Sequence, residues 1–218
     1  MDTISTLRTT GATRHFTDEP VPDATLYELL DDARFAPSGG NRQPWRVAVV
    51  KDPAIRRRLG ELIQPVWDGY VARATLGVTP YNCVDDDREP PTVSAVPNAL
   101  IDRIETLPVV LVVAADLCKI ALMDSVLDRP PLTGGASLYP FCWSILLAAR
   151  ERGLGGVMTT FLSRAEPAAA PVVALPEHHA VAAMIFLGVP ERQVTRLRRE
   201  PVETFATLDR FDGAPFTG

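Results

Sequence analysis

The chain has 218 residues, of which 46% are hydrophobic and 22% charged, and its formal net charge at pH 7 is −5. This composition is typical of a globular protein with a sizeable core, and the acidic balance argues against a nucleic-acid partner, which needs a basic face. The three cysteines lie far apart without any CxxC, which argues against a disulfide framework or a zinc site. Neither a signal peptide nor an apolar run of membrane-spanning length is present, so we expect a single domain over residues 1–218, cytoplasmic and with no membrane partner.

The first half of the chain predicts helices around one short strand. Residues 23–36 place Leu26, Leu29 and Leu30 at helical spacing, and the run RVAVV after Trp45 is rich in β-formers. The segment from 52 to 74 begins with Asp-Pro, a helix-start signal, and continues in amphipathic fashion. Because proline disrupts helical hydrogen bonding, Pro65 predicts a division into two consecutive helices.

Residues 76–97, LGVTPYNCVDDDREPPTVSAVP, form the least regular part of the sequence. Their prolines and the acidic run exclude a regular element of any length. Two interpretations remain, a solvated surface connection and a mobile lid over a binding site. We expect the lid, with Tyr81 and Val84 offering apolar surface to a bound aromatic acceptor.

The second half predicts the core of a sheet. The run LPVVLVVAADL is apolar on both faces and therefore predicts a central strand, and GVMTTFL and AVAAMIFLGVP predict two more. Between them, residues 135–152 predict a long helix that is apolar nearly all round and so buried in a core or a subunit interface. The mixed order of helices and strands predicts an α+β, three-layer arrangement.

The decapeptide APSGGNRQPW, residues 36–45, is unusually rich in amides and glycine. Glycine lets a ligand approach the backbone closely, while Ser, Asn and Gln supply neutral hydrogen-bonding groups. The alternative is a plain turn anchored by a buried Trp45, and both interpretations can hold together. No GxSxG, P-loop or GxGxxG is present, and GLGG at 153–156 follows a helix rather than a strand.

Four stretches together resemble the successive motifs of the FMN-dependent nitroreductase family, in the family's order and over nearly the whole chain. They are RTTGATRHFTDEPVP, APSGGNRQPWRVAVV, GGASLYPFCWSILLAARERGLGGVMTT and FLGVPERQVTRLRREPVE. The PS-x-x-N-x-Q-P-W turn is the most specific of them. The resemblance implies a nitroreductase-like three-layer fold, a central mixed sheet wrapped by helices, and an interlocked homodimer with an FMN in each of two interface sites.

The resemblance also implies which residues bind the cofactor. Arg8, Thr10 and Arg14 belong to the stretch that holds the phosphate and ribityl chain, and Arg198 and Arg199 close on the phosphate. From the other subunit come Pro37, Ser38, Gly39 and Asn41, and against the isoalloxazine ring lie Met158, Thr159 and Thr160. The family usually has an arginine where this chain has Thr10 and Gly11, so one phosphate contact differs. For each arginine alone, a solvated surface position is the alternative.

The implied reaction passes hydride from NADH or NADPH through flavin N5 to a nitroaromatic, a quinone or a similar small acceptor, in a ping-pong cycle. The cofactor carries the chemistry, so no catalytic side chain is expected, and no metal. One alternative is a protein of the same fold that binds or sequesters flavin without turnover. Others are fragmentation of the flavin, a specialised substrate such as a halogenated tyrosine or an enone, and a deazaflavin donor.

Overall fold

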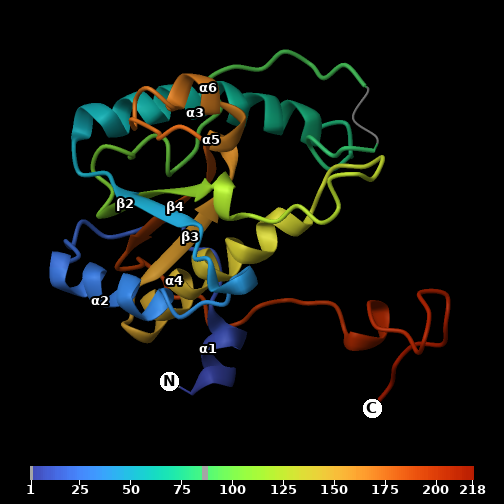
Figure 1. Cartoon of the computed structure of the whole chain (residues 1–218). Helices are drawn as coiled ribbons and strands as arrows, with labels where there is room; N and C mark the ends of the chain where they lie inside the picture. Colours follow the sequence, from blue (N-terminus) through green and yellow to red (C-terminus); the bar gives the residue numbers. More distant parts are fainter. Residues whose placement is uncertain (1, 85–87) are drawn as a thin grey trace.

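The computed structural model describes residues 2–84 and 88–218, in which a four-stranded sheet lies between two helical layers (Figure 1). The strands are β1 (Trp45–Val49), β2 (Val109–Asp116), β3 (Gly155–Thr159) and β4 (His179–Gly188). The α-helices are α1 (Thr3–Thr9), α2 (Asp23–Ala33), α3 (Pro53–Ala74), α4 (Tyr139–Glu151), α5 (Phe161–Arg164) and α6 (Glu166–Ala169). Short 3₁₀ turns occupy Gly39–Asn41, Leu117–Lys119, Thr133–Ser137 and Val202–Thr204. The predicted three-layer α+β arrangement is confirmed.

The sheet has the strand order β1-β2-β4-β3, and all three ladders are antiparallel. β2 is paired on both sides, as its uninterrupted apolar sequence predicted. The expected mixed sheet is therefore wrong for the four strands of this chain. Parallel pairing among the described residues is limited to an isolated bridge between Ala12 and Gly156, because the N-terminal segment touches β3 at one point and forms no ladder.

Each face of β2 packs into its own hydrophobic cluster. Leu111 and Val113 point into the cluster formed with α2 and α4, whereas Val110 and Val112 point into the cluster formed with α3, α5 and α6. All four side chains are buried. Because both faces are covered, the strand needs no polar alternation, which explains why its sequence is continuously apolar.

α3 continues through Pro65 as one helix, so the predicted division is wrong. The proline removes one helical hydrogen bond, but buried contacts hold the helix on both sides of it. Leu59 and Ile63 are buried before it and Ala72 after it. At its first turn, the buried Arg56 donates to the carbonyls of Val50, Glu105 and Leu107, at 2.7, 3.1 and 2.6 Å. Tertiary contacts thus outweigh the local cost of the proline.

α4 is shorter than the predicted helix over 135–152, since a 3₁₀ turn precedes it. Phe141, Ile145 and Ala149 are buried, but Tyr139 and Trp143 are 40% and 37% exposed, so the helix keeps an uncovered apolar stripe. Even so, no helix in the described ranges 2–84 and 88–218 is both long and apolar enough to cross a membrane.

The GLGG sequence allows a close backbone approach. Thr13 N donates to the carbonyl of Gly156 at 2.9 Å, which holds the N-terminal segment beside β3. A Cβ on Gly155 would lie 2.7 Å from Thr13 Oγ1, and one on Gly156 would lie 2.5 Å from Leu187 Cδ2. Real Cβ atoms do not approach so closely, so both positions require glycine. The pair serves packing and brings Arg14 to the end of β3.

Candidate functional site

A cavity of about 700 Å³ lies where the N-terminal segment, the end of β3 and α3 meet. One part of its wall is aromatic: the rings of Trp67 and Tyr70 are stacked at 5.8 Å, and Phe161 meets both edge-on at 5.6 Å. We call this the aromatic cavity. Its lining residues are Arg14, His15, Trp67, Tyr70, Pro97, Asn98, Ala99, Leu100, Met158, Thr159, Thr160 and Phe161. Four of the predicted cofactor-binding residues therefore come together here.

Two buried polar atoms of this lining lack a hydrogen-bond partner within the described residues. They are Trp67 Nε1, which is a donor, and Thr159 Oγ1, which both donates and accepts. Leaving such an atom unsatisfied costs about 1–3 kcal/mol, so native structures keep few of them. Both residues line the cavity, whose wall is flat and aromatic with polar side chains beside it, and the isoalloxazine ring of a flavin is flat with a polar edge. The lining therefore fits the cofactor that the sequence implied.

Arg14 reaches the cavity because the backbone around it is fixed. Thr13 is buried and bonded to β3, and Phe16 is fully buried in the core. With these two side chains turned inward, Arg14 and His15 remain exposed and line the cavity. A guanidinium at this position can form charge-assisted bonds to an anionic ligand.

The amide-rich turn lines a different, smaller cavity of about 290 Å³, which we call the turn cavity. Its lining residues are Pro37, Ser38, Gly39, Arg42, Ala121, Met123, Thr133, Ala136 and Ser137. Gly39 N donates to Ser137 Oγ at 2.9 Å, which ties the turn to the segment before α4. No described residue lines both cavities.

The turn is also braced from within. Gln43 N donates to Ser38 Oγ at 3.0 Å, and the Gln43 side-chain amide donates to Asn41 Oδ1 at 3.1 Å. Trp45 stacks on Phe141 of α4 with ring centroids 4.6 Å apart and planes only 2° from parallel. Trp45 thus anchors the turn by stacking, although it is half-buried and not buried as predicted. The side chains of Ser38 and Asn41 both already accept a hydrogen bond from Gln43.

A profile of the nitroreductase family matches residues 7–189. The chain belongs to the nitroreductase family. It is 28% identical over 217 residues to an NADH dehydrogenase of Thermus thermophilus, covering 87% of each chain. It is 26% identical over 183 residues to iodotyrosine deiodinase 1 of Rattus norvegicus, covering 84% of this chain and 60% of that protein's length. The solved structure of an NADPH:FMN oxidoreductase from Vibrio harveyi, complexed with NAD+, shares the fold, with a TM-score of 0.69 at 19% identity over 96% of this chain and 77% of that chain.

Five further residues predicted to bind the cofactor of this nitroreductase-family chain line neither cavity, and one of them is Asn41 of the amide-rich turn. Arg8 is exposed on α1, and Arg198 and Arg199 are exposed in the C-terminal tail, where Arg199 Nη1 donates to the Arg198 carbonyl at 2.8 Å. Thr10 is buried, and its hydroxyl donates to the carbonyl of Thr6 at 2.7 Å. The predicted roles of these five residues in cofactor binding stay predictions.

Gly11, where the family usually has an arginine, is covered by the C-terminal tail. A Cβ at this position would lie 2.8 Å from Leu197 Cδ2 and 2.9 Å from Val194 Cγ1. Because Gly11 has no side chain, Val194 and Leu197 of the tail can pack directly against it. This contact brings a tail that carries Arg196, Arg198 and Arg199 next to the N-terminal segment.

Sequence reasoning missed several lining residues of this site, among them Trp67, Tyr70 and Asn98. The first two are three positions apart on α3, a spacing that places them on one face of the helix. That spacing is a usable signal, but it is indistinguishable from the apolar periodicity of a core-facing helix. Asn98 follows an irregular segment, and the sequence contains no signal that brings it to the cavity.

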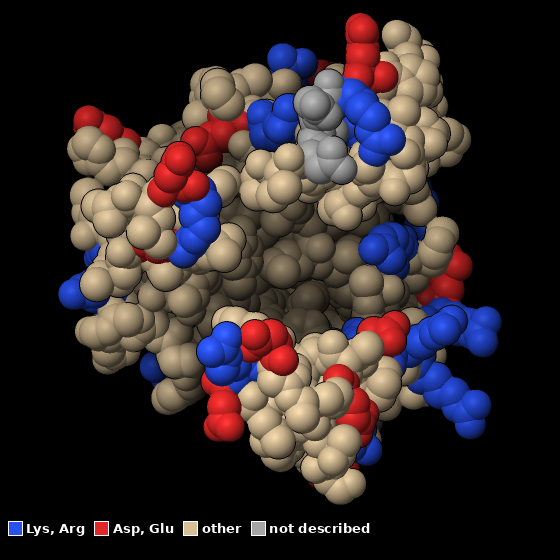
Figure 2. Space-filling view, turned by 90° about the vertical axis from the view of Figure 1, so that its right-hand side faces the viewer, with Lys and Arg blue, Asp and Glu red and all other residues tan. Residues whose placement is uncertain are grey.

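The expected lid, residues 76–97, is described except for 85–87, so most of its acidic run lies outside the described residues. Tyr81 does not line the aromatic cavity, since its ring lies between the guanidinium groups of Arg73 and Arg164, 4.4 and 4.0 Å from them. Val84 is 91% exposed. Of the segment, Pro97 reaches the cavity wall. Figure 2 shows a hollowed face whose floor is uncharged, with Lys, Arg, Asp and Glu side chains around its rim.

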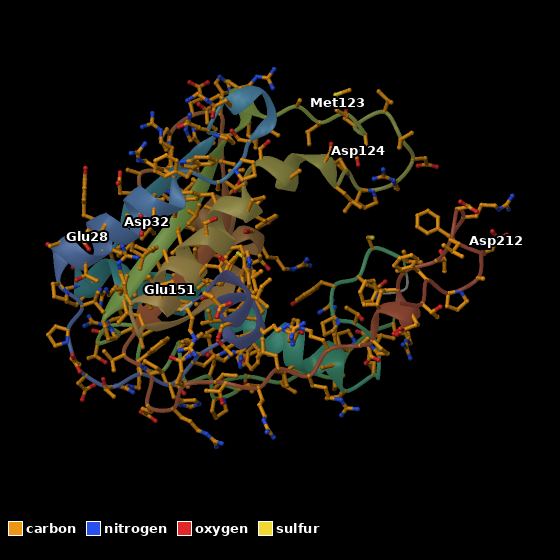
Figure 3. All side chains as sticks on the ribbon, turned by 90° about the horizontal axis from the view of Figure 1, so that it is seen from below. Glu28, Asp32, Met123, Asp124, Glu151 and Asp212 are labelled. Atoms are coloured by element: carbon orange, nitrogen blue, oxygen red, sulfur yellow. The ribbon has the colours of Figure 1, made fainter. Side chains whose placement is uncertain are left out.

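Beside the turn cavity, one buried carboxylate organises the loop that carries Met123 (Figure 3). Asp124 accepts from Leu132 N at 2.8 Å, from Thr133 Oγ1 at 2.6 Å and from Arg129 Nη1 at 2.6 Å. The bonds from Leu132 and Thr133, with Arg129 in support, hold the pKa of Asp124 well below its ordinary value. The ionised form is thus the one that the folded loop stabilises.

This depressed pKa predicts a pH-dependent contribution to stability. A carboxylate whose pKa is lower in the folded state stabilises the fold above its unfolded pKa, here 3.8, and this contribution disappears as the pH falls through the folded value. We expect Asp124→Asn to melt below the wild type at pH 6, and the difference in Tm to shrink below pH 3.8. A difference in Tm that is independent of pH would show that the charge of Asp124 is not what holds the loop.

Proposed function

We propose that this chain is a flavin oxidoreductase that holds FMN in the aromatic cavity and passes hydride from NADH or NADPH to a small acceptor such as a nitroaromatic or a quinone. The observation that carries the proposal is the aromatic cavity, which brings Arg14 and Thr159 beside the stacked rings of Trp67 and Tyr70. Membership of the nitroreductase family supports it, as do the names of an NADH dehydrogenase and an NADPH:FMN oxidoreductase among the similar proteins.

When bound, FMN would supply the centre that accepts and then donates hydride. The protein's own residues would bind, orient and shield it. Trp67 and Thr159 would bond to its polar edge, and Arg14 would offset negative charge that develops there. The aromatic wall would exclude water and offer a face for a planar acceptor. The described lining contains neither a carboxylate nor a thiol, which suits hydride chemistry that needs no covalent nucleophile from the protein.

We also propose that a homodimer completes the site. Within one chain, the turn predicted to reach the flavin from the other subunit lines a cavity of its own, separate from Arg14 and Met158. Exposed apolar side chains stand on two projecting segments, Met123 on one and Phe211 on the C-terminal tail, 80% and 104% exposed. Apolar surface of this extent is usually covered by a partner. A second subunit would bring its own turn to this side of the molecule.

A second candidate function is reductive removal of halogen from a halogenated tyrosine. The likeness to iodotyrosine deiodinases over 84% of this chain favours it, and an aromatic ring would fit beside Trp67 and Tyr70. The chain spans about 60% of the length of those relatives, however. A flavin-binding protein without turnover is the third possibility of the same fold.

Purification and anaerobic titration test the proposal directly. We expect the protein to retain visible flavin absorbance, to bleach on addition of NADH or NADPH, and to recover its colour when a nitroaromatic or a quinone is added. Recovery with iodotyrosine alone would favour dehalogenation, and retained flavin that neither nicotinamide bleaches would favour binding without turnover. A protein that takes up no FMN even after reconstitution would contradict the proposal.

A further inference from the structure

Four consecutive residues of α3 serve two different structures. Trp67 and Tyr70 line the aromatic cavity, whereas Asp68 and Gly69, between them, hold two separate parts of the segment 76–97. Successive helical side chains point about 100° apart, so positions 68 and 69 are turned away from the face that 67 and 70 share. The same helical turn thus forms the aromatic wall of the cavity and the contact surface for the segment 76–97.

Asp68 holds the end of the segment that leads into the cavity. Asp68 is 8% exposed as a residue, and its carboxylate accepts from Ala95 N at 3.0 Å and from Val96 N at 2.9 Å. The side-chain amide of Gln64 donates both to Asp68 Oδ1, at 2.8 Å, and to the Val96 carbonyl, at 3.0 Å. Burial alone would raise the pKa of Asp68, but the bonds from Val96, Gln64 and Ala95 keep it below its ordinary value. The group is therefore ionised and accepts only.

Gly69 holds the other part of the segment. A Cβ at Gly69 would lie 2.4 Å from the Tyr81 hydroxyl, so the ring can lie against the helix only because this side chain is missing. The hydroxyl donates to the Val66 carbonyl at 3.3 Å, and the ring lies between the cations of Arg73 and Arg164. Tyr81 thereby also joins α3 to α5, whose first residue lines the cavity.

We propose that Asp68 is a positioning residue that determines acceptor selectivity. The backbone bonds to Ala95 and Val96 fix the chain immediately before Pro97 and Asn98, which form the cavity wall. Without the carboxylate, the N–H groups of Ala95 and Val96 lose their acceptor and this wall shifts relative to the aromatic rings. The inference rests on the proposed function, since it concerns what the cavity admits and not whether flavin is bound.

The test compares two alanine variants of the same helix. Asp68→Ala removes the buried carboxylate, and Asp52→Ala removes an exposed one that caps α3 by accepting from Ala54 N at 2.8 Å, away from both cavities. We expect Asp68→Ala to raise KM for nitrobenzoate and benzoquinone unequally, by about 10-fold for the more affected one, with flavin reduction by nicotinamide within about 3-fold of wild type. Asp52→Ala should leave both KM values unchanged. Faster amide hydrogen exchange at Ala95 and Val96 should accompany the change.

Asp68→Asn keeps the size of the side chain and serves if the alanine variant does not fold. Its single oxygen can accept from one of the two N–H groups, so we expect an intermediate change in the KM ratio. Faster exchange at residues 95 and 96 with an unchanged KM ratio would overturn the proposal and leave Asp68 a purely structural residue. If the wild type does not turn over, the proposed function fails by itself. Equilibrium dialysis then measures the affinity of each protein for nitrobenzoate and benzoquinone. Equal affinities in wild type and both Asp68 variants would overturn the role of Asp68.

Discussion

Gly155→Val should lower stability and abolish flavin retention together. A Cβ at Gly155 would lie 2.7 Å from Thr13 Oγ1 and 2.9 Å from Thr13 Cβ, so a branched side chain must push the N-terminal segment off β3. Overpacking of this kind costs about 1–3 kcal/mol. The displaced segment is the one that holds Arg14 at the aromatic cavity, so the ligand contact is lost with the packing. Thermal melting and the flavin absorbance of the purified variant measure the two effects.

Ala48→Val provides the matched control, because it adds the same branched side chain at an exposed position of β1. It should change neither the Tm nor flavin retention appreciably. If Gly155→Val melted like wild type and stayed yellow, the N-terminal segment would have room to shift, and close packing at β3 would not be what positions Arg14.

The sequence predicted those elements whose residues interact with near neighbours or with any apolar surface. The continuous apolar run of β2 predicts a central strand wherever it is placed, and Trp45 anchors the amide-rich turn by stacking on Phe141. The predicted division at Pro65 was wrong. Proline does remove one helical hydrogen bond, but the sequence around it does not show the tertiary packing that holds the helix together.

The missed features of the site depend on contacts between segments far apart in sequence. Asp68 meets Ala95 and Val96 from 27 and 28 positions away, and no periodicity encodes such a pairing. Trp67 and Tyr70 have the spacing of ordinary core residues, and their role emerges only when the cavity beside them is known. The turn at 36–45, the most specific motif in the sequence, lines the smaller cavity of the single chain.

The departure from the family pattern at Gly11 leads to the last prediction. Sequence comparison alone suggests that Gly11→Arg restores a missing phosphate contact and strengthens FMN binding. The structure predicts the opposite, because Val194 and Leu197 occupy the space into which the new side chain would extend. Val194 and Leu197 belong to the C-terminal tail, which also carries Arg196, Arg198 and Arg199. Displacing it would remove these arginines from the neighbourhood of the N-terminal segment.

We therefore expect Gly11→Arg to weaken FMN binding by about 10-fold or more, about 1.4 kcal/mol, despite its added positive charge. Gly218→Arg adds the same charge where no atom lies within 4 Å of the new Cβ, and should leave the affinity unchanged. Fluorescence titration of the apoprotein with FMN measures both dissociation constants, and limited proteolysis of residues 191–218 reports whether the tail is released. Tighter binding in Gly11→Arg would show that the tail yields to the arginine. In that case the family's usual phosphate contact, and not the tail, would be the arrangement that the fold favours.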